Sequence, residues 1–129
     1  MSAGLNQITI LGRLGKDAIT NETHTEITVT HFDVAVDESY KNKAGTKIEK
    51  ATWFRCEAWN GRGQAIAKYT EKGNRILITG RMEFRSYDRM VEVNGEQAAI
   101  KFPDPILVVD DFKIIDWKVE GDGFDPEHL

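Results

Sequence analysis

The sequence predicts an all-β fold, a Greek-key barrel that contains one short helix. Short runs rich in β-branched and aromatic residues alternate in hydrophobicity with period two, the pattern of half-buried strands. Glycine, proline and asparagine lie between these runs, where turns are expected. Residues 61–74 instead contain a run of good helix formers.

The first two predicted strands lie in residues 5–14 and 26–40. The first (LNQITILGRL) is rich in β-branched residues, and Gly12 within it indicates a bend or bulge. Residues 16–26 (KDAITNETHTE) are polar and are expected to form a turn. The second strand has an apolar stripe, which predicts its core face: Thr28, Thr30, Phe32, Val34 and Val36.

The third predicted strand, residues 51–60 (ATWFRCEAWN), follows a loop at 41–50 that carries four lysines around Gly45. Alternate side chains of a strand point to opposite faces. The core face is an ordinary stripe of Phe54, Cys56 and Ala58. The face that an antiparallel sheet usually leaves to water carries two large rings and two charges: Trp53, Arg55, Glu57 and Trp59.

Residues 61–74 predict a helix of about three turns that stops at Gly73. Residues 74–87 return to strand, and Gly80 within this strand predicts a kink. One face of this strand carries Arg81, Arg85 and Tyr87. Glu83 lies on the same face and, as an acidic residue, does not fit a basic surface.

Residues 88–102 predict a β-hairpin with Asn94-Gly95 at its tip, and a closing strand is expected at 106–117 after an interruption by Pro103 and Pro105. One helix between the third and fourth long strands is the order of a five-stranded OB barrel, a fold that holds oligonucleotides on its sheet face and loops. We expect this domain to span 1–117. A short, acidic and flexible tail is expected at 118–129.

Composition and charge restrict the class of protein. The chain has 129 residues, enough for one domain with a real core, and no apolar run near the roughly 20 residues of a membrane span. It lacks a signal-peptide pattern, and its single cysteine excludes an internal disulfide, so we expect a soluble cytoplasmic protein. The net charge of −4 hides an asymmetry, because residues 1–103 hold 15 bases and 13 acids while the rest is acidic.

The polar residues do not form a recognisable catalytic or metal-binding pattern. The three histidines (His24, His31 and His128) have no ligand spacing with Cys56 or the carboxylates. The GRLG at 12–15 lacks the glycines and the helix of a phosphate-binding fingerprint. We therefore expect a protein that is not an enzyme and needs no cofactor or metal.

Exposed aromatic rings beside basic residues favour nucleic-acid binding instead. Every base has a π-face, so Trp53 and Trp59 can serve as platforms that need no particular sequence. Tyr40 lies at the mouth of the lysine loop, and the fourth strand adds Tyr87. The alternative is that the tryptophans pack under a loop or in a subunit interface, where tryptophan is enriched.

At these residues the chain resembles the bacterial-type single-stranded DNA-binding proteins. The resemblance follows the order NQITILGRLG, FDVAVDESYKNKAG, TWFRCEAWNG and AIAKYTEKGNRILITGRMEFRSY, so it covers residues 5–87 well and 106–115 loosely. It implies a homotetramer of OB domains that wraps DNA. It also implies base stacking on the family's aromatic positions, which are here Tyr40, Trp53, Trp59 and Tyr87.

Two segments depart from that family. Its proteins usually end in an acidic tip with a terminal Pro-Phe that recruits replication and repair proteins, whereas this chain ends in DGFDPEHL. Recruitment through the tail is therefore not implied here. Residues 88–105, with a hairpin and two prolines, also differ from the family's usual loop.

The sequence thus predicts sequence-independent binding of single-stranded DNA in replication, recombination and repair. A protein-binding OB module, such as a primosome component, is the alternative, but such a module does not need aromatics along a basic groove. The first strand (Ile8, Ile10 and Leu14) is the candidate contact of a homotetramer. The residues predicted to neutralise phosphates are Arg13, Lys16, Lys41, Lys43, Lys47, Lys50, Arg55, Arg62, Arg81 and Arg85.

Overall fold

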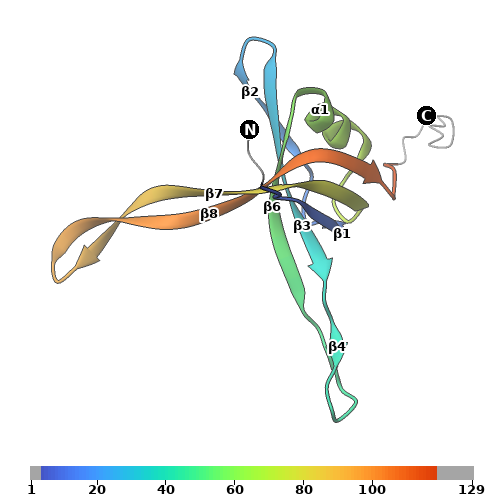
Figure 1. Cartoon of the computed structure of the whole chain (residues 1–129), viewed down its shortest axis with the longest axis horizontal. Coiled ribbons are helices and arrows are strands. Elements are labelled where there is room, and N and C mark those ends of the chain that lie inside the picture. The colour runs from blue at the N-terminus through green and yellow to red at the C-terminus, as the bar shows by residue number, and fades with distance from the viewer. Residues whose placement is uncertain (1–3, 119–129) are drawn as a thin grey trace.

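The computed structural model describes residues 4–118 of the chain. The elements, in chain order, are β1 (Ile8–Leu14), β2 (Ile19–His24), β3 (Ile27–Asp37), β4 (Tyr40–Lys41), β5 (Lys47–Ile48), β6 (Ala51–Trp59), α1 (Asn60–Tyr69), β7 (Arg75–Val93) and β8 (Glu96–Ile114) (Figure 1). The predicted tail at 118–129 lies, apart from Lys118, outside the described residues.

Five of these strands close into a barrel. The sheet order is β1-β7-β8-β6-β3-β2, and a second pairing of β1 with β3 joins the ends of the five-stranded part. The β6–β8 pair is parallel, whereas β3 and β6 pair antiparallel. The helix α1 follows the third barrel strand, β6. The predicted all-β OB barrel with one helix between its third and fourth strands is therefore confirmed.

The core face of the third strand is also as predicted. Cys56 and Ala58 are fully buried, and Phe54 is partly buried against the same cluster. Burial disfavours the thiolate and raises the pKa of Cys56 to about 12, so this cysteine is a core residue. The helix α1 places Ile66 in the same cluster, on the end of the barrel near β3.

The segment predicted as a polar turn, residues 16–26, contains the strand β2. It pairs antiparallel with β3 from Ile19 opposite His31 to His24 opposite Ile27. All six residues of β2 are exposed, so it has no apolar face and gives no periodic signal in the sequence.

Pro103 and Pro105 were expected to interrupt the strand before residue 106, but they do not. The strand β8 continues through Pro103 and Pro105, which face Ser86 and Phe84 of β7. On its other side β8 pairs with β6 only at positions 107 and 108. The prolines therefore lie where that side of β8 is an edge, and an edge tolerates a residue without an N–H.

The strands β7 and β8 consequently form one long ribbon, each with 19 residues. Its tip is Asn94-Gly95 as predicted, with φ of 51° and 81°, the left-handed values that a tight two-residue turn requires. The prediction for Gly80 is confirmed, since the register between β7 and β8 shifts between Thr79 and Gly80.

Two other glycines have different roles from those expected. The register of β1 with β7 is continuous through Gly12, without a bulge; a Cβ there would lie 2.4 Å from the Ala35 carbonyl oxygen, so glycine permits the close approach of β1 and β3. The helix ends at Tyr69 rather than at Gly73. Gly73 lies in the following turn with φ of 90° and donates its N–H to the Leu14 carbonyl.

The side chains of β1 that were predicted to contact another subunit point mostly into the barrel. Ile10 and Leu14 are both buried in the barrel core, and Ile8 packs against it. The side chains of Ile10 and Leu14 are therefore not available for a contact between subunits. The apolar side chain that β1 exposes is Leu11, with 51% of its surface accessible.

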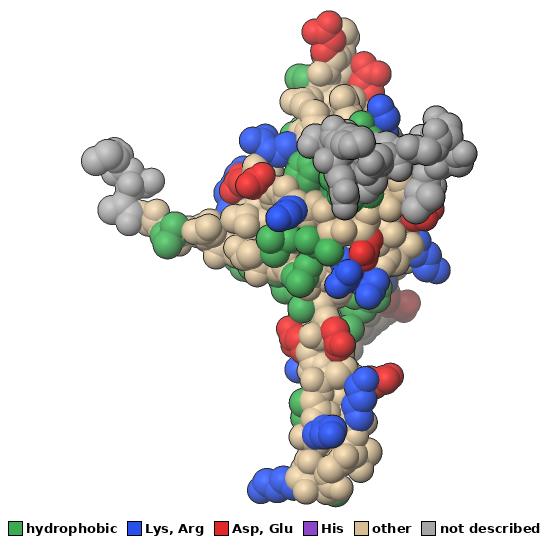
Figure 2. Space-filling view, turned by 90° about the vertical axis from the view of Figure 1, so that its right-hand side faces the viewer, with side chains coloured by type: hydrophobic (Ala, Val, Ile, Leu, Met, Phe, Trp, Pro, Cys, Tyr) green, Lys and Arg blue, Asp and Glu red, His purple; other side chains and the backbone are tan. Residues whose placement is uncertain are grey.

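Three arms extend from the barrel in different directions. They are the β2–β3 end, the β4–β5 hairpin and the distal β7–β8 ribbon (Figure 1). Figure 2 shows basic side chains toward the tip of the lower arm, β4–β5, and acidic ones at the tip of the upper arm, β2–β3. Within residues 4–118, the structure contains no helix that is long and apolar enough to cross a membrane.

Candidate nucleic-acid interface

Trp53 lies in the middle of the outer face of the barrel. It stands opposite Ala35 of β3, which in turn stands opposite Arg13 of β1, so these three side chains share a face. A Cβ on Gly15 would lie 2.4 Å from the Trp53 ring, which means that the ring rests directly on the backbone after β1. The ring is nevertheless 60% exposed, as a stacking platform requires.

Trp59 ends β6 and occupies the N-cap position of α1, where its side chain makes no capping hydrogen bond. The turn into the helix is fixed because the Asn60 side chain accepts a hydrogen bond from the Thr28 N–H. The indole Nε1 of Trp59 donates to Glu57 at 2.9 Å. This hydrogen bond restrains the indole ring at its N–H edge, while Trp59 remains 38% exposed.

The Glu57 carboxylate connects three side chains of the outer face, those of Arg85, His31 and Trp59, and is called the hub below. Arg85 donates two hydrogen bonds to its carboxylate, at 2.8 and 3.0 Å, and His31 lies 3.2 Å from it. These bonds, led by those of Arg85, lower the pKa of Glu57 although burial opposes them. The same pair raises the pKa of Arg85. Glu57, predicted to face water, is only 3% exposed, because its partners cover it.

Three arginines of this face, Arg55, Arg81 and Arg85, are held by carboxylates. Arg55 lies 3.9 Å from both Asp33 and Asp104. Arg81 bonds Asp110 at 3.1 Å and Glu83 at 3.2 Å, and Glu83 also accepts from Arg85. Three arginines therefore face five carboxylates, and the expected basic groove is not basic on the sheet itself: Asp33, Glu57, Glu83, Asp104 and Asp110.

Three cations without such partners among residues 4–118 lie on the β4–β5 arm or beside it. In the predicted lysine loop, β4 and β5 pair with Tyr40 opposite Ile48 and Lys41 opposite Lys47. The Asn42 side chain accepts two backbone N–H groups and shapes the turn. Tyr40 is 54% exposed at the base of this hairpin. The described part of the chain places no carboxylate within 4.0 Å of Lys41, Lys43 or Lys50.

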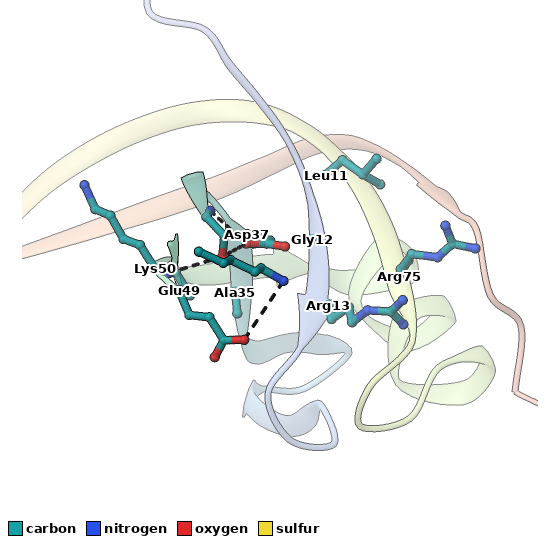
Figure 3. A pocket seen from close by; sticks show the side chains of 11 residues that line it. Leu11, Gly12, Arg13, Ala35, Asp37, Glu49, Lys50 and Arg75 are labelled. Carbon is teal, nitrogen blue, oxygen red and sulfur yellow. Dashed lines mark hydrogen bonds and ion pairs between the residues drawn. The ribbon is translucent and has the colours of Figure 1, made fainter. Parts of the chain in front are cut away.

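Two hollows are lined by neighbours of Trp53 on the outer face, although Trp53 itself lines neither. One, of about 310 Å³, is lined by Lys16, Arg55 and Arg85 together with Glu57. The other, of about 670 Å³, lies between β1 and the β4–β5 hairpin and is drawn in Figure 3.

The cations of the second hollow do not converge on one point. In Figure 3 the Lys50 side chain extends away on one side and Arg75 on the other. Arg13 donates to the Gly73 carbonyl at 2.9 Å and lies 3.8 Å from Asp116, which also binds Arg75. The second hollow is therefore a broad surface rather than a site for one anion.

The remaining predicted residues lie farther along the surface. Tyr87 is on the distal ribbon, 48% exposed, and its ring stacks on Phe102. Arg62 lies on α1 and lines neither hollow. The sequence interpretation missed the hub role of Glu57 and the ring of Phe102. The parity that placed Glu57 beside the tryptophans was the available signal for the first.

Comparisons with known proteins place the chain in a family. The model of the single-strand binding protein family matches residues 5–102. Single-stranded DNA-binding protein 1 of Chlorobaculum tepidum is 34% identical over 88 residues, which are 68% of this chain and 54% of that protein. Single-stranded DNA-binding protein B of Bacillus subtilis is 36% identical over 89 residues, 69% of this chain and 77% of that protein.

A solved structure supports the fold independently. The Plasmodium falciparum SSB in complex with ssDNA superposes with a TM-score of 0.66 at 23% identity, covering 90% of this chain and 99% of that one. Together with the family match, which spans most of the barrel, the comparisons show that this chain belongs to the single-strand binding protein family.

Proposed function

We propose that this protein binds single-stranded DNA without sequence preference, through the outer face of its barrel. The observation that carries the proposal is the exposure of four rings, on β4, β6 and β7, in a family member: Tyr40, Trp53, Trp59 and Tyr87. Bases stack on such rings whatever their identity, at roughly 1–3 kcal/mol each. The rings provide the stacking platform. In this proposal the protein binds DNA and catalyses no reaction.

Phosphates are neutralised mainly by the arms. Lys41, Lys43 and Lys50 lie on or beside the β4–β5 hairpin without a carboxylate partner in the described chain, and Lys16 lines the hollow next to Trp53. The arginines of the sheet face are paired with carboxylates, and one of them, Arg85, fixes the Glu57 carboxylate to which Trp59 donates. Binding of this kind protects single strands in replication, recombination and repair in the cytoplasm.

The protein acts as a homotetramer in this proposal. The exposed Leu11 on the outside of β1, beside the half-buried Leu77 of β7, supplies an apolar surface for a symmetric contact. The division into a barrel at 1–117 and a tail at 118–129 stays a prediction, as does any recruitment of other proteins through that tail.

Titration of tryptophan fluorescence with oligo(dT) tests the function. We expect quenching on binding, because bases stack on the indoles. Trp53→Ala is expected to weaken binding by about 1–3 kcal/mol. Because Trp53 is exposed, this variant should unfold at nearly the wild-type temperature.

Trp117 provides the control for these titrations. It packs edge-on against Tyr69, 5.3 Å between ring centroids. We expect Trp117→Phe, which retains a ring for that contact, to bind oligo(dT) like the wild type. A wild-type protein that shows no affinity for oligo(dT) but captures a protein partner would instead support the protein-binding alternative.

A further inference from the structure

The distal β7–β8 ribbon carries a row of side chains on the same face as the candidate interface. Along this face Arg85 stands opposite Asp104, and Tyr87 stands opposite Phe102. Arg89 occupies the next position of the face toward the tip. The ribbon extends away from the barrel at this point (Figure 1).

Phe102 is in contact with two of these side chains. Its ring centroid lies 5.9 Å from that of Tyr87, with the two planes 23° apart. The guanidinium carbon of Arg89 lies 5.7 Å from the same centroid. Offset stacking and a cation over a ring are both favourable arrangements. Phe102 therefore joins a three-member cluster in which Tyr87 keeps nearly half of its surface free.

We propose that Phe102, held by Arg89, is a positioning residue that presents the Tyr87 ring to a base. This inference rests on the proposed function and adds to it a residue that does not need to touch DNA. The stacked geometry leaves the other side of the Tyr87 ring for a nucleobase, so that base, Tyr87 and Phe102 form one column.

The location of Tyr87 explains why support is needed. A two-stranded ribbon has no core beneath it, so a side chain on it samples several rotamers unless a neighbour restrains it. Fixing a mobile side chain on binding costs affinity, whereas a ring that is already oriented avoids that cost. Loss of the Phe102 ring should therefore weaken DNA binding by about 2- to 12-fold, the size of an aromatic pair.

The opposite face of the ribbon offers a matched control. Phe84 lies three residues before Tyr87 on β7, on the other parity, and is 78% exposed. Phe84→Ala removes the same side chain as Phe102→Ala from the same ribbon. It should leave the affinity for oligo(dT) unchanged.

A double-mutant cycle in the full chain tests the inference, with oligo(dT) affinity and thermal unfolding as readouts. We expect Phe102→Ala and Phe102→Leu to weaken binding, and Phe102→Tyr to restore it because the ring returns. In a Tyr87→Ala background, Phe102→Ala should have no further effect.

Three results would overturn the proposal. Binding of oligo(dT) by Phe102→Leu as tight as that of the wild type would reduce the role of Phe102 to apolar packing. An equal loss in the Tyr87→Ala background would make Phe102 an independent DNA contact. Equal losses for Phe84→Ala and Phe102→Ala would reflect the ribbon as a whole. These results differ from failure of the proposed function, in which the wild type itself does not bind oligo(dT).

Discussion

The salt dependence of DNA binding can be calculated from the ion pairs of the free protein. Ten cations are predicted to meet phosphates, and five of them have a carboxylate within 4.0 Å: Arg13, Lys47, Arg55, Arg81 and Arg85. If each of the five others neutralises one phosphate, log affinity falls with log salt with a slope of about −3.5, at −0.7 per phosphate. Participation of all ten would give a slope of about −7.

Fluorescence titration with an oligo(dT) that covers one site, at several salt concentrations, measures this slope. A single charge reversal on the hairpin, Lys43→Glu, should flatten the slope by about 0.7 and weaken binding at low salt. The control is Lys72→Glu, an exposed reversal of equal charge in the turn after α1. A slope near −7 would mean that the arginines leave their carboxylates to bind DNA. Equal effects of the two reversals would refute a specific role of the hairpin.

Three further predictions follow from the site. Glu57→Gln should lower the unfolding free energy by about 1–3 kcal/mol at neutral pH, because Arg85 loses one of its two carboxylate partners and keeps only Glu83. As the folded pKa of Glu57 is lowered, its stabilisation is complete above pH 4.5 and is lost as pH falls through the folded pKa, so the wild type and variant should converge in acid denaturation. Gly15→Ala should displace the Trp53 ring and weaken oligo(dT) binding by less than the roughly 1–3 kcal/mol of a full stack, while the fold persists in circular dichroism. Leu11→Lys should reduce the mass in light scattering if β1 forms the subunit contact, and an unchanged oligomer would exclude that surface.

The barrel was predictable because hydrophobicity alternates with period two along most of its strands. In the second half of β3 and in β6, apolar core residues such as Phe32 and Cys56 alternate with charged residues such as Asp33, so alternation identifies both strands. The strand β2 could not be found in this way, since all its side chains are exposed. Pro103 was misread for another reason: whether a proline lies on an edge depends on which strand pairs beside it, and that is set by the tertiary fold.

The same contrast applies to the candidate site. Parity along one strand placed Trp53 and Trp59 on the outer face, where both lie. It could not show that Glu57 and Arg85, 28 residues apart, would meet across the outer face. Counting basic residues therefore overestimated the positive charge of the groove. The pairing of these arginines with carboxylates depends on the register of three strands. The sequence of a single segment does not determine that register.

The arrangement separates two tasks that sequence-independent binding requires. Stacking needs rings with fixed orientation, and the bidentate fork of Arg85 on Glu57 fixes the hub that holds Trp59. Phosphates along a flexible strand occur at variable positions, and they suit the compact charge of lysine on a long stem. The sheet face thus uses arginine internally, and the β4–β5 arm presents lysine outward. A change from arginine to lysine at position 85 would accordingly act through the orientation of Trp59, since the positive charge itself is retained.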